Sequence, residues 1–159
     1  MDVPTASPLG VVAAYRLAWP SGDSPRATTL SWNEVFAVLV VSHLVGDFLF
    51  QTDWQARHKY GGLGPDPLSR RALRNHIATY MLAFLPALVW IALELDLARA
   101  VLVGVVVAVP HWIQDDGRLL DAYMAQVKGL AQTSAGLRVA VDQSFHAVFL
   151  LGAALLVVA

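Results

Sequence analysis

Four long stretches of the chain are almost wholly apolar, and polar or helix-breaking residues separate them. They cover residues 32–51, 73–93, 97–113 and 137–159. A helix needs about 20 mostly apolar residues to cross the hydrocarbon core of a bilayer, and about 17 can suffice. The pattern therefore predicts an all-α integral membrane protein whose four transmembrane helices form an antiparallel bundle.

The connections between these predicted helices differ in kind. Residues 52–72 contain several Gly and Pro and are typical of a long loop, whereas residues 94–96 make a tight acidic turn. The third connection has apolar residues at near-helical spacing up to Gly129, which predicts a short amphipathic helix at the membrane interface. These apolar residues are Leu119, Leu120, Tyr123, Met124, Val127 and Leu130.

Residues 1–31 are predicted to form a mostly irregular tail, because prolines interrupt them repeatedly. Within this tail the apolar segment from Leu9 to Trp19 is too short to span a bilayer and contains Arg16, so we expect it to lie on a membrane surface. Arg16 also argues against a cleaved signal peptide. Two parts are thus expected, the tail at 1–31 and the transmembrane domain at 32–159.

Composition supports a membrane location. The chain is 57% hydrophobic and 14% charged, whereas soluble proteins average about 25% charged residues. The net charge of −1 and the lack of long charged runs indicate no nucleic-acid partner, which leaves membrane lipid as the expected one. The sequence contains no cysteine, so His, Asp and Glu are its only strong candidate metal ligands.

The distribution of Lys and Arg predicts the orientation in the membrane. Eight basic residues lie in or beside the first and third connections, and three lie on the other side. The eight are Arg57, Lys59, Arg70, Arg71, Arg74, Arg118, Lys128 and Arg138, and the three are Arg16, Arg26 and Arg99. Because cytoplasmic loops carry an excess of positive charge, we expect the first and third connections in the cytoplasm and both termini outside.

Seven ionisable residues lie within or beside the predicted spans. They are His43, Asp47, His76, His111, Asp115, Asp142 and His146. Six of them form three pairs at i and i+4, a spacing that places both side chains on one helix face. They occur towards the ends of the first and third spans and the starts of the second and fourth. Because successive spans alternate in direction, all seven then lie in the same leaflet of the membrane. The orientation predicted above makes this the cytoplasmic leaflet.

A divalent metal would compensate these charges, because an Asp near the centre of a span costs about 2.5–3.5 kcal/mol on insertion scales. Mixed imidazole and carboxylate ligands favour zinc, with manganese or iron as alternatives, and seven candidates leave room for one or two ions. The alternative is that each His bonds a neighbouring helix and nearby arginines hold the Asp side chains. His58 lies in a basic polar loop, where we expect it to be solvated.

Three of the seven residues are also candidate catalytic groups. One of Asp47, Asp115 and Asp142 would act as a general base in a metal-dependent hydrolase. Gln51, Gln143 and Arg118 lie near the same predicted site and are candidate substrate contacts, although the glutamines would equally serve as hydrogen-bonding groups between helices. Arg70, Arg71 and Arg74, with Arg118, are candidates for holding a phosphate.

The ordered blocks of these residues resemble a bacterial and phage membrane family, domain of unknown function 3307. The resemblance rests on three blocks over about residues 33–152: HxxxDFxxQ at His43, HxxxD at His111, and DQxxH at Asp142. Some relatives are expected to carry a second His one turn after His76, where this chain has Tyr80. The resemblance implies a bacterial inner membrane and no particular reaction.

Three functions are compatible with this pattern. The first is a metal-dependent hydrolase acting on a lipid-like phosphoester or acyl substrate. The second is a metal or proton transporter, which is disfavoured because the outer halves of the spans carry almost no polar residues. The third is a structural membrane protein with a stabilising metal site, which an open coordination position would distinguish from an enzyme.

Overall fold

The structure is a computed structural model that describes residues 30–129 and 134–159, and these residues include helices and no strand. Four helical stretches are long and apolar enough to cross a membrane: Trp32–Phe50, Pro67–Glu94, Leu97–Asp115 and Ala135–Val158. The prediction of an all-α protein with four such helices is confirmed. The segment from Leu9 to Trp19, expected on a membrane surface, lies outside the described residues.

Capping residues determine where three of the long helices begin. Asp66 accepts a hydrogen bond from the Ser69 backbone N–H at the start of α4 (Pro67–Glu94), and Pro67 occupies the first turn. Asp96 and Ser134 cap α5 (Leu97–Asp115) and α7 (Ala135–Val158) in the same way. Such side chains satisfy backbone N–H groups that have no partner within the helix.

The first long stretch consists of two kinds of helix. α2 (Trp32–Leu44) continues directly into η1 (Val45–Phe50), a π-helical segment. Short π-helical segments occur mostly as single wide turns within α-helices, frequently at functional sites. In η1, Gly46 and Asp47 are buried while the three residues after them are exposed. The wide turn therefore directs Asp47 into the bundle.

The connections are more helical than the sequence pattern indicated. α3 (Asp53–His58) lies within the first connection, where Thr52 and Gln55 form a reciprocal cap at its start. α4 begins six residues before the predicted span, because its cap lies in the polar segment that precedes the apolar one. In the third connection, α6 (Arg118–Gln126) buries Leu120 and Met124, as expected for an amphipathic helix. Leu130 lies outside the described residues.

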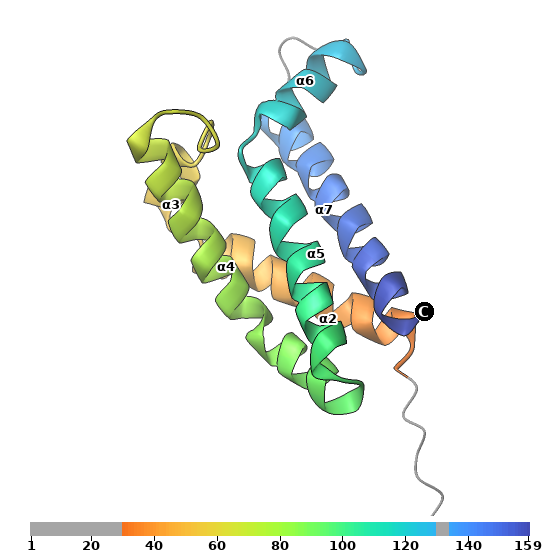
Figure 1. The fold of residues 1–159 in the computed structure, drawn as a ribbon. Helices are drawn as coiled ribbons and strands as arrows, with labels where there is room; N and C mark the ends of the chain where they lie inside the picture. Colours follow the sequence, from red (N-terminus) through yellow and green to blue (C-terminus); the bar gives the residue numbers. More distant parts are fainter. Residues whose placement is uncertain (1–29, 130–133) are drawn as a thin grey trace, which may run out of the picture.

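Figure 1 shows the arrangement of the helices. α5 lies between α4 and α7, and α2 crosses behind them, in contact with α4 and α7. Successive long helices run in opposite directions. The turn between α5 and α6 therefore lies at the same end of the bundle as α3.

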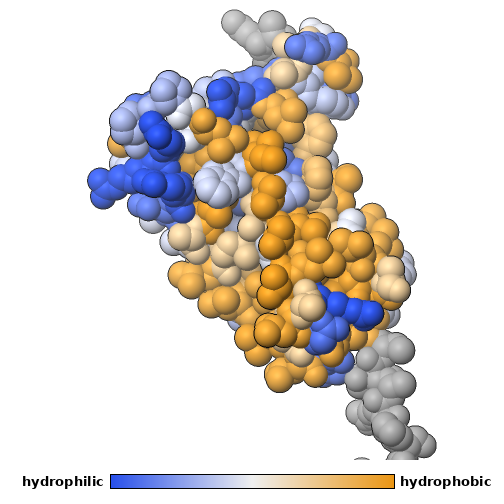
Figure 2. All heavy atoms as spheres, in the orientation of Figure 1, coloured by the Kyte–Doolittle hydropathy of each residue, from blue (hydrophilic) through white to orange (hydrophobic). Residues whose placement is uncertain are grey.

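The two ends of the bundle differ in chemistry. Towards the α4–α5 turn the core formed by the described residues is apolar, with Val35, Ile91, Val103 and Val157 at most 1% exposed. Hydrophilic residues gather around α3 and the start of α4, while much of the remaining visible surface is apolar (Figure 2). Large exposed apolar patches indicate contact with lipid or with other proteins, and with four such helices they indicate a multi-pass membrane protein.

Candidate metal centre

His43 and Asp47 occupy the last turn of α2 and the π-helical segment that follows it. Both are buried, and Nδ1 of His43 lies 3.7 Å from Oδ2 of Asp47. Nε2 of His43 lies 2.9 Å from Oε1 of Gln143 on α7, and Nδ1 lies 3.1 Å from the Tyr80 hydroxyl. One tautomer satisfies both contacts: Nε2–H donates to Gln143, and Nδ1 accepts from Tyr80. Both nitrogens of His43 then have partners.

α4 contributes His76 and, one turn later, Tyr80. His76 is completely buried, and its Nδ1 lies 3.1 Å from the Gln51 amide nitrogen. The Tyr80 ring lies flat against His111, with 3.5 Å between ring centroids and 8° between planes. A Cβ on Gly46 would approach Cδ2 of Tyr80 to 2.5 Å. Only glycine at position 46 allows η1 to pack this closely against α4.

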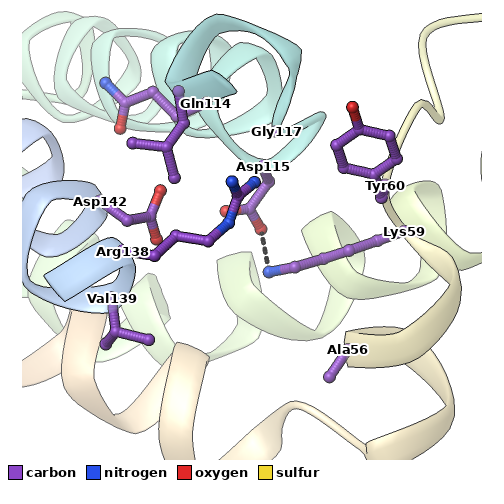
Figure 3. Close-up of a pocket in the computed structure, with 10 residues that line it drawn as sticks. Ala56, Lys59, Tyr60, Gln114, Asp115, Gly117, Arg138, Val139 and Asp142 are labelled. Carbon is purple, nitrogen blue, oxygen red and sulfur yellow. Dashed lines mark hydrogen bonds and ion pairs between the residues drawn. The ribbon is translucent and has the colours of Figure 1, made fainter. Parts of the chain in front are cut away.

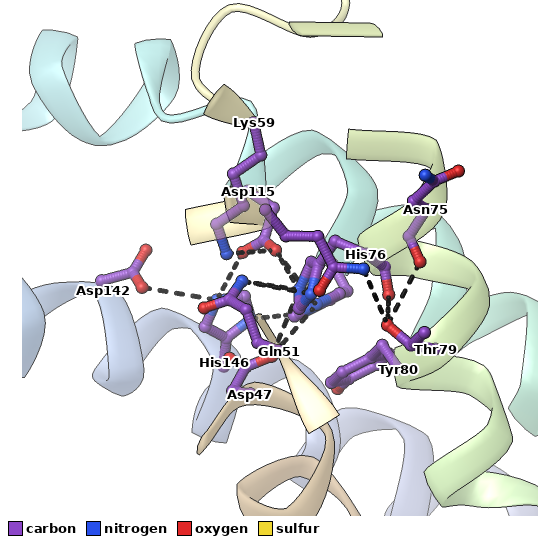
Figure 4. Close-up of polar contacts among 12 residues, drawn as sticks. Asp47, Gln51, Lys59, Asn75, His76, Thr79, Tyr80, Asp115, Asp142 and His146 are labelled. Atoms are coloured by element: carbon purple, nitrogen blue, oxygen red, sulfur yellow. Dashed lines mark hydrogen bonds and ion pairs between the residues drawn. The ribbon is translucent and has the colours of Figure 1, made fainter. Parts of the chain in front are cut away.

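α5 supplies His111 and Asp115, and these complete a group of four candidate ligands with His76 and Asp47. Nε2 of His76 lies 3.1 Å from Nε2 of His111 and 2.6 Å from Oδ2 of Asp115. Oδ1 of Asp47 lies 3.4 Å from Nε2 of each histidine, and Nε2 of His111 lies 3.3 Å from Oδ2 of Asp115. Three helical stretches thus converge on one point (Figure 4).

These separations fit a divalent metal with four ligands. A tetrahedral zinc site with bonds of about 2.0–2.1 Å has ligand atoms about 3.3 Å apart, and four of the five distances lie between 3.1 and 3.4 Å. The His76–Asp115 contact is shorter and would have to widen. Oδ1 of Asp47 is buried and has no hydrogen-bond partner among the described residues, as expected of an atom suited to a cation.

His146 on α7 lies on the other side of His111. Nδ1 of His111 is 3.2 Å from Nδ1 of His146, so His111 can donate a proton to His146 while its Nε2 faces the four-residue group. Histidines that bind a metal usually donate their second N–H in this way. His43, His111 and His146 also form a second group that could hold an ion, and His111 is the residue that both groups share.

Asp142 lies at the edge of the centre rather than within it. Its side chain is 27% exposed, and Oδ2 lies 3.6 Å from Nε2 of His146. Asp142 belongs to neither of the two groups of candidate ligands among the described residues. Six of the seven predicted ligands therefore belong to these groups, and Asp142 lies one turn of α7 away from His146.

The three predicted substrate contacts have different surroundings. Gln143 bonds His43 and lies 3.5 Å from Oδ2 of Asp47. Gln51 contacts His76. Both glutamines therefore orient groups of the centre. Arg118 is instead the first residue of α6, and its side chain is 53% exposed. It donates to Asp116 and does not touch the centre.

A cavity of about 320 Å³ adjoins the centre at the hydrophilic end of the bundle. Asp115 lies in the middle of its lining, between Lys59 and Arg138 (Figure 3). Asp142 and Gln114 line one side, and Tyr60 the other. The group of four candidate ligands is thus in contact, through Asp115, with a cavity large enough for a small ligand.

Three residues around the centre were not predicted as parts of it. Lys59 places Nζ 2.7 Å from Oδ2 of Asp115, although in the sequence it stands in a polar loop and was counted among the basic residues that predict orientation. Tyr80 occupies the position where some relatives are expected to carry a second histidine. Gln114 is 5% exposed, and neither atom of its amide has a partner among the described residues. Its place directly before Asp115 was the one available signal.

A network at the ends of the spans, formed by Tyr60, Asp121 and, in the first turn of α7, Arg138, closes one wall of the cavity. The Tyr60 hydroxyl donates to Asp121 at 2.6 Å, and Arg138 also donates to Asp121. Partial burial opposes ionisation of Asp121, but these two hydrogen bonds hold its pKa below the usual range. The hydrogen bond to Asp121 raises the pKa of Tyr60. Asp121 therefore stays ionised at neutral pH and holds Arg138 at the cavity.

The fold and the centre define a class: a multi-pass helical membrane protein with a buried His/Asp cluster that could hold a metal ion. Within this class, the chain belongs to the family described as "Protein of unknown function (DUF3307)", whose model matches residues 35–159. The predicted resemblance is confirmed. Comparison with curated proteins and with solved structures gave no match.

Proposed function

We propose that this protein is a metal-dependent membrane hydrolase that acts on a lipid-like phosphoester or acyl substrate. The observation that carries the proposal is the contact between four convergent candidate ligands and a cavity lined by polar groups. A metal site that only stabilised the bundle would need no such cavity. Catalytic sites, in contrast, keep a position open to water or substrate, which this centre would provide if the ion took a fifth ligand or used three of the four candidates.

The charges around the centre support a divalent ion. Asp47, Asp115 and Asp142 bring three carboxylates, and within 4 Å of them Lys59 is the one Lys or Arg among the described residues. Three carboxylates and one ammonium leave two negative charges to be balanced. Such uncompensated charge is costly within a membrane. The donor set favours zinc, with manganese or iron as alternatives. Such an ion lowers the pKa of bound water and polarises the bond to be cleaved.

The residues of the chain then have distinct roles. Asp47, His76, His111 and Asp115 would hold the ion. His146 accepts the second proton of His111, while Gln51, with its amide oxygen turned to the ring, would accept that of His76. Asp142 is the carboxylate left outside the ligand groups. It lines the cavity and pairs with His146, which suits it to accept a proton from an attacking water.

The apolar end of the bundle argues against transport. A transporter needs polar groups on both sides of its binding site. Beyond the histidines, the described core of this chain consists of residues such as Leu39, Phe84 and Val107, all at most 3% exposed. We expect substrate to enter and leave at the hydrophilic end, which by the positive-inside rule faces the cytoplasm of a bacterial inner membrane.

Metal content and turnover of the purified full chain test this proposal together. We expect about one or two divalent ions per chain by elemental analysis, and hydrolysis of nitrophenyl phosphate or nitrophenyl acyl esters. Asp142→Asn should retain the ions and lose about 10²–10⁴-fold in rate, the usual contribution of a positioned base. Asp53→Asn is the matched control, because Asp53 is an exposed carboxylate paired with Arg57 on α3.

Two results would contradict the proposal. Wild-type protein purified without stoichiometric divalent metal would exclude the metal centre. Metal-loaded Asp142→Asn protein with the wild-type rate would show that Asp142 is not the base.

A further inference from the structure

The cavity beside Asp115 combines positive charge with unused hydrogen-bond donors. Lys59 and Arg138 both line it. An ammonium has three N–H donors and a guanidinium five, and hydrogen bonds to Asp115 and Asp121 use one donor of each side chain. The remaining donors are available to a ligand that enters from the hydrophilic end.

Gln114 adds an unpartnered buried amide to the same cavity. It lines the cavity, is 5% exposed, and its nitrogen and oxygen lack hydrogen-bond partners among the described residues. A buried polar group that lacks a hydrogen-bond partner destabilises the protein. A bound ligand that offers an oxygen acceptor would remove this destabilisation.

The wall that holds Arg138 is fixed by close backbone packing. Gly117 has a φ of +79°, and a Cβ there would approach the Tyr60 ring to 2.7 Å. Asp116 accepts from the backbone N–H groups of Gly61 and Leu63, at 2.8 and 2.7 Å. These contacts join the first connection to the α5–α6 turn. Lys59 directly precedes this junction in the chain, and Asp121 holds Arg138 beside it.

We propose that this cavity binds the phosphate group of a lipid-like phosphate monoester, with Lys59, Arg138 and the Gln114 amide as its donors. This inference rests on the proposed hydrolase and narrows its substrate, because a neutral acyl ester would leave the remaining donors of both cations without an anionic partner. The phosphate candidates expected from sequence do not line the cavity; these are Arg70, Arg71, Arg74 and Arg118. Figure 3 shows Arg138 and Lys59 extending towards Asp115 from opposite sides.

Titration calorimetry on the metal-loaded full chain in detergent tests the site, with Asp142→Asn as the background so that bound substrate is not hydrolysed. The probes are inorganic phosphate, dihexanoyl phosphatidic acid and dihexanoyl phosphatidylcholine. We expect Arg138→Gln to weaken binding of phosphatidic acid at least about tenfold, since a charge-assisted hydrogen bond is about twice as strong as a neutral one. Arg138→Lys should restore part of the affinity. Arg57→Gln, at an exposed arginine on α3, should bind as tightly as the Asp142→Asn background.

The other probes identify the source of the phosphate. Phosphatidic acid should bind at least about tenfold more tightly than inorganic phosphate and than phosphatidylcholine. Equal affinity for inorganic phosphate would overturn the lipid part of the proposal, and tighter binding of phosphatidylcholine would overturn the monoester part.

Metal analysis of the same samples keeps the two proposals apart. Unchanged affinity for phosphatidic acid in both Arg138→Gln and Lys59→Gln, with full metal content, would overturn the phosphate site and leave the hydrolase standing. Absence of metal from wild-type protein would instead overturn the hydrolase. Lys59→Gln serves as the second variant in case loss of the Arg138–Asp121 pair impairs folding.

Discussion

The same four helices build two ends of opposite character. At one end Val35, Ile91, Val103 and Val157 fill the space between the helices with apolar atoms. At the other end His76, His111 and Asp115 occupy equally buried positions. Lipid tails are as apolar as these side chains, so the apolar end gains little from exclusion of water and is held by close packing. The polar end is held by hydrogen bonds, ion pairs and, as proposed, a metal.

This difference separates stability from chemistry along the bundle axis. A change at the apolar end should affect folding and leave the ion in place. A change at the polar end should affect the ion first. Variants at matched depths can therefore test whether the two ends are independent.

The largest effect is expected for His111→Ala, because His111 belongs to both groups of candidate ligands. Residues that only orient a ligand account for about 10–100-fold in metal affinity, so loss of this shared ligand should cost more than about 100-fold. Elemental analysis and the shift of the thermal transition by added zinc would measure it. His58→Ala provides the control, since His58 lies on α3 and bonds the Trp54 carbonyl. Full metal occupancy in His111→Ala would refute the assignment.

Ile91→Ala, at the apolar end, is expected to lower the free energy of unfolding and to leave metal binding unchanged. Ile91 is fully buried, and such a truncation costs about 2–5 kcal/mol in soluble proteins. In a bilayer the cost should fall at the lower end of this range, because the unfolded helix keeps its apolar atoms in lipid. Unfolding in mixed micelles measures the change, and metal content should stay at the wild-type level.

Val89→Ala is the matched control for Ile91→Ala, because Val89 lies on the same helix with 56% of its surface exposed. Loss of the ion from Ile91→Ala would show that the two ends are coupled rather than independent.

Much of the fold follows from the apolar pattern alone. The four spans, their alternation and the amphipathic helix after α5 were predicted, because long apolar runs in a bilayer permit only helices. The helix α3 was not predicted, because it is short and lies among residues typical of a loop. Its start depends on the reciprocal contacts of Thr52 and Gln55, which span length does not indicate.

The sequence predicts which residues lie at the same end of the bundle. It predicts less well which of their side chains are in contact. Topology places Asp47, His76, His111 and Asp115 at one end of the bundle. Their meeting depends on the π-helical turn at η1 and on Gly46, neither of which the i and i+4 spacing encodes. The placement of Lys59 beside Asp115 depends on how the first connection folds over the α5–α6 turn.

The smallest effect on metal affinity is expected for Tyr80→Phe. This variant tests how far along α4 the polar end of the bundle extends. The change removes the hydroxyl that lies 3.1 Å from Nδ1 of His43 and keeps the ring stacked on His111. One hydrogen bond contributes about 1 kcal/mol, so zinc affinity should fall only about fivefold. Competition with a chromophoric chelator measures this change, and Tyr123→Phe on α6, whose ring packs against Phe145, is the control. A loss as large as that of His111→Ala would make the Tyr80 hydroxyl part of the metal site itself, and the boundary between the two ends would then lie one turn of α4 deeper in the bundle.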